Sequence, residues 1–161
     1  DMRELNLPER FDAVYCLFDS IGYVQTNEAI RKVLDGVSAQ LKSGGLFVFE
    51  FWHAAAMLTS FEPRRERHWQ LADGELVRVS TTKLDVPRQL AEVSYEIKEF
   101  SDGKLVGELK ETQVNRFFLV QEMAAFLEQS GFRVLNFLHA YDKEAVIDGN
   151  TWHVLAVAQR S

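Results

Sequence analysis

The feature that most constrains the fold is a strand–helix–strand pattern in the first third of the chain. Residues 11–18 and 46–52 are short apolar runs rich in β-forming residues, as expected for strands buried on both faces of a parallel sheet. Between them, apolar side chains recur with helical spacing over 27–41, after Thr26 and Asn27, either of which can cap the first amides. Two strands joined by such a helix are parallel, so the pattern predicts an α/β fold.

The middle of the chain changes to long segments in which apolar and polar residues alternate. This period of two is typical of strands with one solvated face. The alternating segments are residues 75–85, 90–100 and 104–118. Turn signals at 73–74 and 101–103 separate segments of this kind. We therefore expect a single α/β domain over 1–161, with an antiparallel β region inserted at 64–118.

The last third returns to the first pattern. Residues 119–130 have a helical apolar face that ends at Gly131, and 132–140 and 151–159 are short strands. A turn-rich stretch at 148–150 joins the two strands, which favours an antiparallel pair at one edge of the sheet.

Charge argues against a nucleic-acid partner. The formal net charge is −6, whereas nucleic-acid binding needs a basic face. The only basic cluster consists of Arg64, Arg65 and Arg67. Glu62 and Glu66 interrupt it, so we interpret this cluster as part of a solvated loop.

Two further features indicate a cytoplasmic protein without a membrane partner. Glu50 and His53 interrupt the longest apolar run, which is shorter than the about 20 residues of a membrane helix. Cys16 is the only cysteine, which excludes an internal disulfide and any multi-cysteine zinc site and fits a reducing compartment.

Several local patterns occur in the order typical of one enzyme family. An acidic turn stands at 1–3, S-I-G-Y at 20–23, L-K-S-G-G-L-F at 41–47, and E-x-x-x-x-L-x-x-x-G-F at 122–132. With these patterns the chain resembles the C-terminal part of class I S-adenosylmethionine-dependent methyltransferases. It is most similar to the small-molecule N-methyltransferases of the amino-sugar and glycine type. The resemblance implies a truncated Rossmann-like sheet, strands four to seven with flanking helices, plus the β insertion.

The chain also departs from this family. The glycine-rich loop after the family's first strand has no counterpart, because Gly44 and Gly45 follow a helix and precede a strand. Gln113 stands where the family often has a histidine in E-x-H-x-x-R. We expect that the first third of the enzyme is missing, whether naturally or by preparation, and that this chain alone is catalytically inactive.

The resemblance also implies cofactor contacts, since ligands of open α/β sheets bind at the carboxyl ends of the strands. The acidic turn resembles the family's adenine-reading turn, and the end of the 11–18 strand resembles the segment beside S-adenosylmethionine. The implied cofactor-binding residues are Asp1, Met2, Cys16, Leu17 and Phe18.

Residues at the same edge are candidates for binding the methyl acceptor. These are Asp19, Tyr23, Trp52 and His53. Asp19 and His53 are also the candidates for proton transfer, because an amine or hydroxyl acceptor can need a base. The alternatives are a loop cap for Asp19 and packing for Tyr23.

No other chemistry is indicated. His, Cys and carboxylate spacings predict no metal site, and Ser20 and Ser43 lack the context of a hydrolase nucleophile. We expect His68, His139 and His153 to be structural, because they lie within or beside β segments.

Three hypotheses about function remain. The first is methyl transfer from S-adenosylmethionine to a small-molecule amine or hydroxyl in the complete protein. The second is a non-catalytic, dimerising interaction module derived from a methyltransferase, and the third is another small α/β enzyme. In the family, the strand that corresponds to 11–18 lies beside the first strand of the sheet. Without that neighbour its edge would be open, so we also predict a homodimer through the 11–18 strand.

Overall fold

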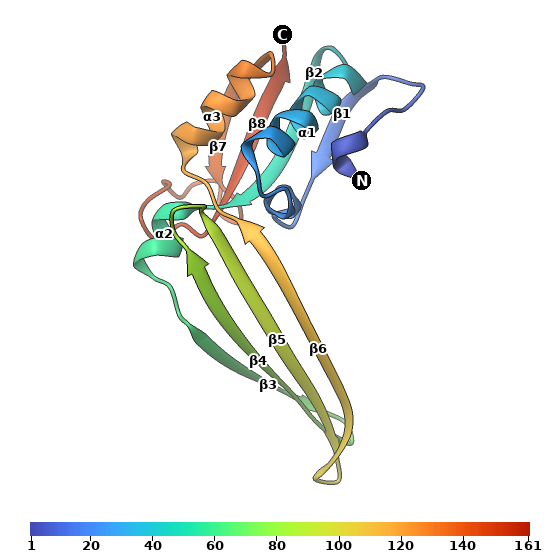
Figure 1. Ribbon diagram of the computed structural model, residues 1–161, viewed down its shortest axis with the longest axis vertical. Helices are drawn as coiled ribbons and strands as arrows, with labels where there is room; N and C mark the ends of the chain where they lie inside the picture. The colour runs from blue at the N-terminus through green and yellow to red at the C-terminus, as the bar shows by residue number, and fades with distance from the viewer. The chain divides into compact units, whose positions relative to one another are not determined.

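A computed structural model describes residues 1–161, which divide into two compact units. We call residues 1–60 and 116–161 the α/β unit and residues 61–115 the β unit. The α/β unit has a four-stranded sheet in the order β1-β2-β8-β7, and the second sheet has the order β3-β4-β5-β6 (Figure 1).

The predicted strand–helix–strand pattern is confirmed, because β1 and β2 are parallel and α1 connects them. Strand β2 begins at Leu41 instead of residue 46, since Leu41 already pairs with Phe11. Strands β7 and β8 form the predicted antiparallel pair, and β8 also pairs antiparallel with β2. The elements of the α/β unit are η1 Met2–Glu4, β1 Phe11–Cys16, η2 Ser20–Tyr23, α1 Asn27–Gln40, β2 Leu41–Trp52, α2 Ala54–Thr59, α3 Val120–Gln129, β7 Phe132–His139 and β8 His153–Arg160.

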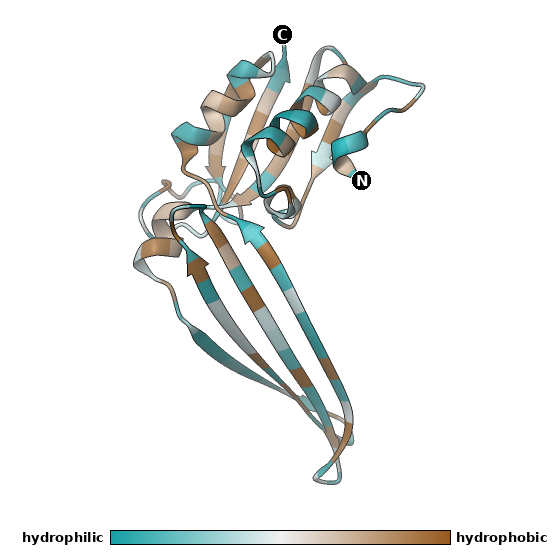
Figure 2. Ribbon diagram, viewed as in Figure 1, coloured by the Kyte–Doolittle hydropathy of each residue, from teal (hydrophilic) through white to brown (hydrophobic).

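Apolar side chains of α1, α3, β2 and β8 form the core of this unit. Thr26 caps α1 as predicted, because its Oγ1 accepts a hydrogen bond from the Ala29 amide at 3.2 Å. Phe47, Phe49 and Phe51 lie on the same face of β2 and are fully buried. Figure 2 shows that hydrophobic and hydrophilic residues are mixed along the two longer helices of this unit. No helix is both long and apolar enough to cross a membrane.

The second sheet confirms the three predicted strands and adds one that was not predicted. Its strands are β3 Arg64–Leu71, β4 Gly74–Asp85, β5 Leu90–Ser101 and β6 Lys104–Arg116. The prediction of a loop at Arg64, Arg65 and Arg67 was wrong, because these residues belong to β3. Every residue of β3 is exposed, so backbone pairing with β4 forms this strand without an apolar face.

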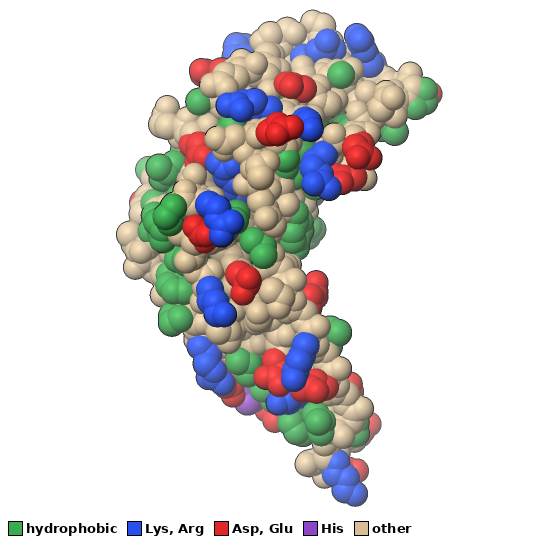
Figure 3. Space-filling model, in the orientation of Figure 1, with side chains coloured by type: hydrophobic (Ala, Val, Ile, Leu, Met, Phe, Trp, Pro, Cys, Tyr) green, Lys and Arg blue, Asp and Glu red, His purple; other side chains and the backbone are tan.

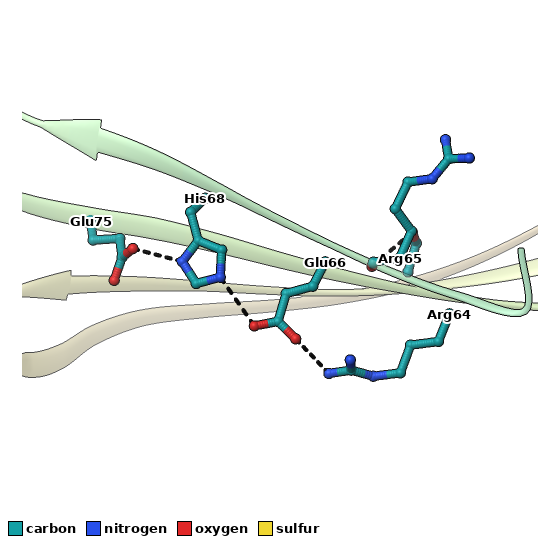
Figure 4. Close-up of polar contacts among 6 residues, drawn as sticks. Arg64, Arg65, Glu66, His68 and Glu75 are labelled. Carbon is teal, nitrogen blue, oxygen red and sulfur yellow. Dashed lines mark hydrogen bonds and ion pairs between the residues drawn. The ribbon is translucent and has the colours of Figure 1, made fainter.

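Charged side chains on β3 and β4 pair with one another. His68 lies between two carboxylates, with Nδ1 2.7 Å from Glu75 and Nε2 3.1 Å from Glu66, and Glu66 also binds Arg64 (Figure 4). These hydrogen bonds, first the one to Glu75, raise the pKa of His68. Basic and acidic side chains are likewise interspersed over the face shown in Figure 3.

Candidate functional site

The carboxyl edge of β1 and β2 carries an unusual backbone. Strand β1 ends at Cys16, opposite Phe49, while β2 continues to Trp52, and the chain after β1 turns through Phe18 and Asp19. Both residues are in the left-handed region, with φ of 57° and 55°. Because this conformation costs a non-glycine residue about 1–3 kcal/mol, it occurs preferentially where function requires it.

Glu50 helps to hold this turn in place. The Phe18 amide donates a hydrogen bond to Glu50 Oε1 at 3.1 Å, and Ser20 Oγ donates to the Leu17 carbonyl at 2.7 Å. The Phe18 ring lies outside this network and is 83% exposed. A hydrogen-bonded turn thus presents a large apolar ring to the surroundings.

Two buried carboxylates lie beneath the turn. Asp19 is 6% exposed and Glu50 is 8% exposed, although buried acidic residues are rare unless they are paired. Asp19 Oδ2 accepts a hydrogen bond from His153 Nδ1 at 2.8 Å, and Glu50 Oε2 accepts one from the Tyr141 hydroxyl at 3.2 Å. The rings of Tyr141 and His153 also make an edge-to-face contact, with centroids 5.3 Å apart.

The negative charge of these carboxylates affects the groups around them. The hydrogen bond to Asp19 raises the pKa of His153 against the opposing effect of burial. Burial raises the pKa of Cys16 to about 11, and the charges of Glu50 and Asp19 add to that effect. Asp19 Oδ1 is buried without a hydrogen-bond partner. The site is therefore suited to a cationic ligand.

One ligand atom from each of Asp19, Glu50 and His153 lies within 4.8 Å of the others, a spacing that a metal ion could bridge. Both oxygens of Glu50 and one of Asp19 already accept hydrogen bonds from the protein. The sequence predicted no such group, because His153 is 134 residues from Asp19 along the chain.

The residues predicted to contact the cofactor lie in two places. Cys16 ends β1, and Leu17 and Phe18 follow it on the carboxyl edge with exposed side chains. Asp1 instead caps η1, where its carboxylate accepts a hydrogen bond from the Arg3 amide at 2.9 Å, and Met2 packs against the core.

The predicted acceptor residues also differ in their surroundings. Asp19 lies in the carboxylate pair, Tyr23 is exposed at the end of η2, and Trp52 pairs with His153 across β2 and β8. His53 is buried, and its Nδ1 lies 3.1 Å from the Thr151 carbonyl. Its ring is thus hydrogen-bonded to the backbone, outside the Asp19–Glu50 pair.

Three members of the site were not predicted as site residues. Glu50 was noted only as a charge that interrupts an apolar strand, although that pattern could have indicated a functional carboxylate. His153 was expected to be structural, and the structure places its Nδ1 against Asp19. Tyr141 follows β7 and had no local signal.

Solved structures are similar to this chain over almost its whole length. A S-adenosylmethionine-dependent methyltransferase from Clostridium acetobutylicum is 18% identical with a TM-score of 0.84, over 99% of this chain and 62% of its own. CalS10, an amino pentose methyltransferase from Micromonospora echinaspora solved with S-adenosylmethionine bound, is 21% identical with a TM-score of 0.79, over 100% of this chain and 63% of its own. The chain has the class I methyltransferase fold. The resemblance noted from the sequence is thus confirmed.

Curated relatives of this methyltransferase-fold chain are sugar N-methyltransferases. The dTDP-3-amino-3,4,6-trideoxy-α-D-glucopyranose N,N-dimethyltransferase of Streptomyces venezuelae is 28% identical over 112 residues, 66% of this chain and 47% of the relative. The dTDP-4-amino-2,3,4,6-tetradeoxy-D-glucose N,N-dimethyltransferase of Saccharopolyspora spinosa is 27% identical over 136 residues, 83% of this chain and 52% of the relative. The chain thus spans about half the length of these relatives. No protein-family model matches it.

Proposed function

We propose that this chain belongs to an enzyme that transfers methyl groups from S-adenosylmethionine to the amine of a small molecule, such as a nucleotide-linked amino sugar. The observation that carries the proposal is the pair of buried carboxylates, Asp19 and Glu50, at the carboxyl edge of two parallel strands. Both the sulfonium of the cofactor and a protonated amine are cations, and both complement this pair.

The chain's residues fit the cofactor in two respects. The exposed side chains of Leu17 and Phe18 offer apolar surface beside the carboxylates, and the strained turn at Phe18 and Asp19 is fixed in place by Glu50. When bound, S-adenosylmethionine supplies a methyl group on a positively charged sulfur. The protein aligns the acceptor, keeps water out and handles the acceptor's proton. We assign cofactor contacts to Asp1, Met2, Cys16, Leu17 and Phe18.

We assign acceptor contacts to Asp19, Tyr23, Trp52 and His53. The curated relatives are named for dimethylation of sugar amines. An amine therefore fits better than a hydroxyl, because a buried carboxylate pair favours a cationic group.

The test is methylation of a defined amine by the complete protein. With S-adenosylmethionine and dTDP-3-amino-3,4,6-trideoxy-α-D-glucopyranose as the probe, mass spectrometry should detect one or two added methyl groups. The same nucleotide sugar with a hydroxyl in place of the amine serves as the control substrate. Methylation of the hydroxyl sugar alone, or of neither sugar, would contradict the proposal.

We further propose that this chain needs a glycine-rich cofactor-binding segment and is catalytically inactive by itself. Its Gly44-Gly45 pair lies within β2, where a strand and not a helix follows, so it cannot cradle a phosphate or carboxylate at a helix N-terminus. Isothermal titration of the chain with S-adenosylmethionine should give no micromolar binding. Micromolar affinity would refute this part of the proposal.

We also propose a cytoplasmic location, because a reducing compartment fits the free thiol of Cys16.

An interaction through β1 is supported by a separate observation. Strand β1 lies at the end of its sheet, and Tyr15 on it is 66% exposed. Open edges of this kind pair with other strands, so we propose a two-fold homodimer through β1. Light scattering should give twice the chain mass for the wild type and for the surface control Val106→Lys, and a smaller mass for Tyr15→Lys. A monomeric wild type at micromolar concentration would exclude the dimer.

A further inference from the structure

His153 has the arrangement of a base held by a carboxylate. Its Nδ1 lies 2.8 Å from Asp19 Oδ2, and because a carboxylate only accepts hydrogen bonds, Nδ1 carries the proton. In the neutral ring the lone pair is therefore on Nε2, for which the structure gives no hydrogen-bond partner. The side chain is 29% exposed at the start of β8, so a ligand at the carboxyl edge could reach it.

We propose that Asp19 and His153 form a dyad in which His153 Nε2 accepts the proton that a cationic amine loses before methylation. This inference rests on the proposed function. The N–H bond of the ammonium breaks, its electron pair stays on nitrogen, and the proton forms a bond with Nε2. The free amine then forms the C–N bond while the S–C bond breaks with its electron pair left on sulfur. His153 passes its proton to water before the next turnover.

Asp19 is a positioning residue in this scheme. Its carboxylate is almost fully buried and is hydrogen-bonded to the imidazole, so it faces the histidine instead of solvent. It selects the Nδ1–H tautomer and stabilises the imidazolium that forms after proton transfer. Glu50 Oε2, held by the Tyr141 hydroxyl, adds a second negative charge that attracts the ammonium.

The charges around His153 set the direction of its pH dependence. Asp19 approaches from the loop after β1, Glu50 from β2, and the Tyr141 hydroxyl from the loop after β7. Both carboxylates raise the pKa of His153, and burial lowers it. A raised pKa brings the base closer to the pKa of about 10 of an amine, which eases proton transfer. Because the active form is neutral, the rate should fall as the pH drops through the pKa of His153.

The first test needs no catalysis. NMR titration of the ¹⁵N-labelled chain should show His153 as the Nδ1–H tautomer with a pKa above the ordinary value of about 6.5. Asp19→Asn should lower that pKa, because it removes the hydrogen-bonded neighbouring charge. His68→Gln removes another carboxylate-paired histidine and should leave the titration of His153 unchanged. An Nε2–H tautomer, or a pKa that Asp19→Asn does not move, would overturn the dyad.

The second test uses the complete protein with S-adenosylmethionine and the dTDP-amino sugar as probe. His153→Gln should lower kcat about 100-fold with little change in KM, and the loss should shrink as the pH rises and the amine deprotonates by itself. Asp19→Asn should shift the acidic limb of the pH profile down by the amount that NMR records. Circular dichroism and the His68→Gln control check that the variants fold.

The possible failures are distinguishable. If the wild type methylates the probe and His153→Gln keeps both its rate and its pH profile, the dyad is refuted while the proposed function stands. If the wild type transfers no methyl group, the proposed function fails and the dyad's role fails with it.

Discussion

The ion pair between Arg116 and Glu122 gives the sharpest prediction for stability. The Arg116 side chain is 6% exposed, and its Nη2 donates to Glu122 Oε1 at 2.7 Å. Its Nη1 donates to the Gln25 carbonyl at 3.3 Å, and its guanidinium lies 4.9 Å from the centre of the Phe118 ring. Arg116 ends β6 and Glu122 lies in the first turn of α3, so the pair fixes the start of that helix. Glu122→Ala would leave the buried cation without its carboxylate.

The loss of stability in Glu122→Ala follows from the burial of the two partners. Breaking a fully buried ion pair destabilises a protein by about 3–5 kcal/mol, because the remaining charge stays desolvated. The Glu122 side chain is 24% exposed, so water can partly replace it, and we expect about 2–3 kcal/mol. For a chain of 161 residues, each kcal/mol shifts Tm by about 2–4 °C. Glu122→Ala should therefore lower Tm by about 5–10 °C.

Differential scanning calorimetry can measure this shift. Glu128→Ala is the matched control, because Glu128 lies exposed on the same helix and the same residues are exchanged. The control should move Tm by less than about 2 °C, as is usual for surface substitutions. If the two variants shift Tm equally, the buried pair contributes nothing beyond helix propensity and the reasoning is wrong.

Three further predictions concern single side chains. Gly45→Ala should destabilise the fold by about 1–3 kcal/mol in urea unfolding, because its Cβ would lie 2.9 Å from the Lys42 carbonyl oxygen, whereas Gly149→Ala, which meets nothing within 4 Å, should be nearly neutral. The rate at which a thiol reagent modifies Cys16 should keep rising with pH up to a pKa of about 11; a plateau near pH 9 would contradict its burial. The raised pKa of His153 contributes stability that is present at low pH and lost as the pH rises through that pKa, so His153→Gln should cost more stability at about pH 6 than at about pH 9; an equal cost would disprove the linkage.

The sequence alone determined the features that depend on neighbouring residues. The apolar stripe of α1, its Thr26 cap and the flanking runs of β1 and β2 are local patterns, and one connecting helix leaves only the parallel arrangement. Strand β3 escaped prediction because its residues are mostly polar and all exposed, and only pairing with β4 makes it a strand. No local signal can describe a strand of that kind.

The candidate site was decided by tertiary structure. The sequence could place Asp19 at the end of a strand, since that position follows from the apolar run before it. It could not pair Asp19 with His153, because that contact arises only when β8 runs antiparallel to β2 and begins opposite Trp52. It could not show either that Glu50 is buried beneath the Phe18 turn. Periodicity records which side of an element faces the core, whereas the distance between two side chains depends on how the whole sheet is ordered.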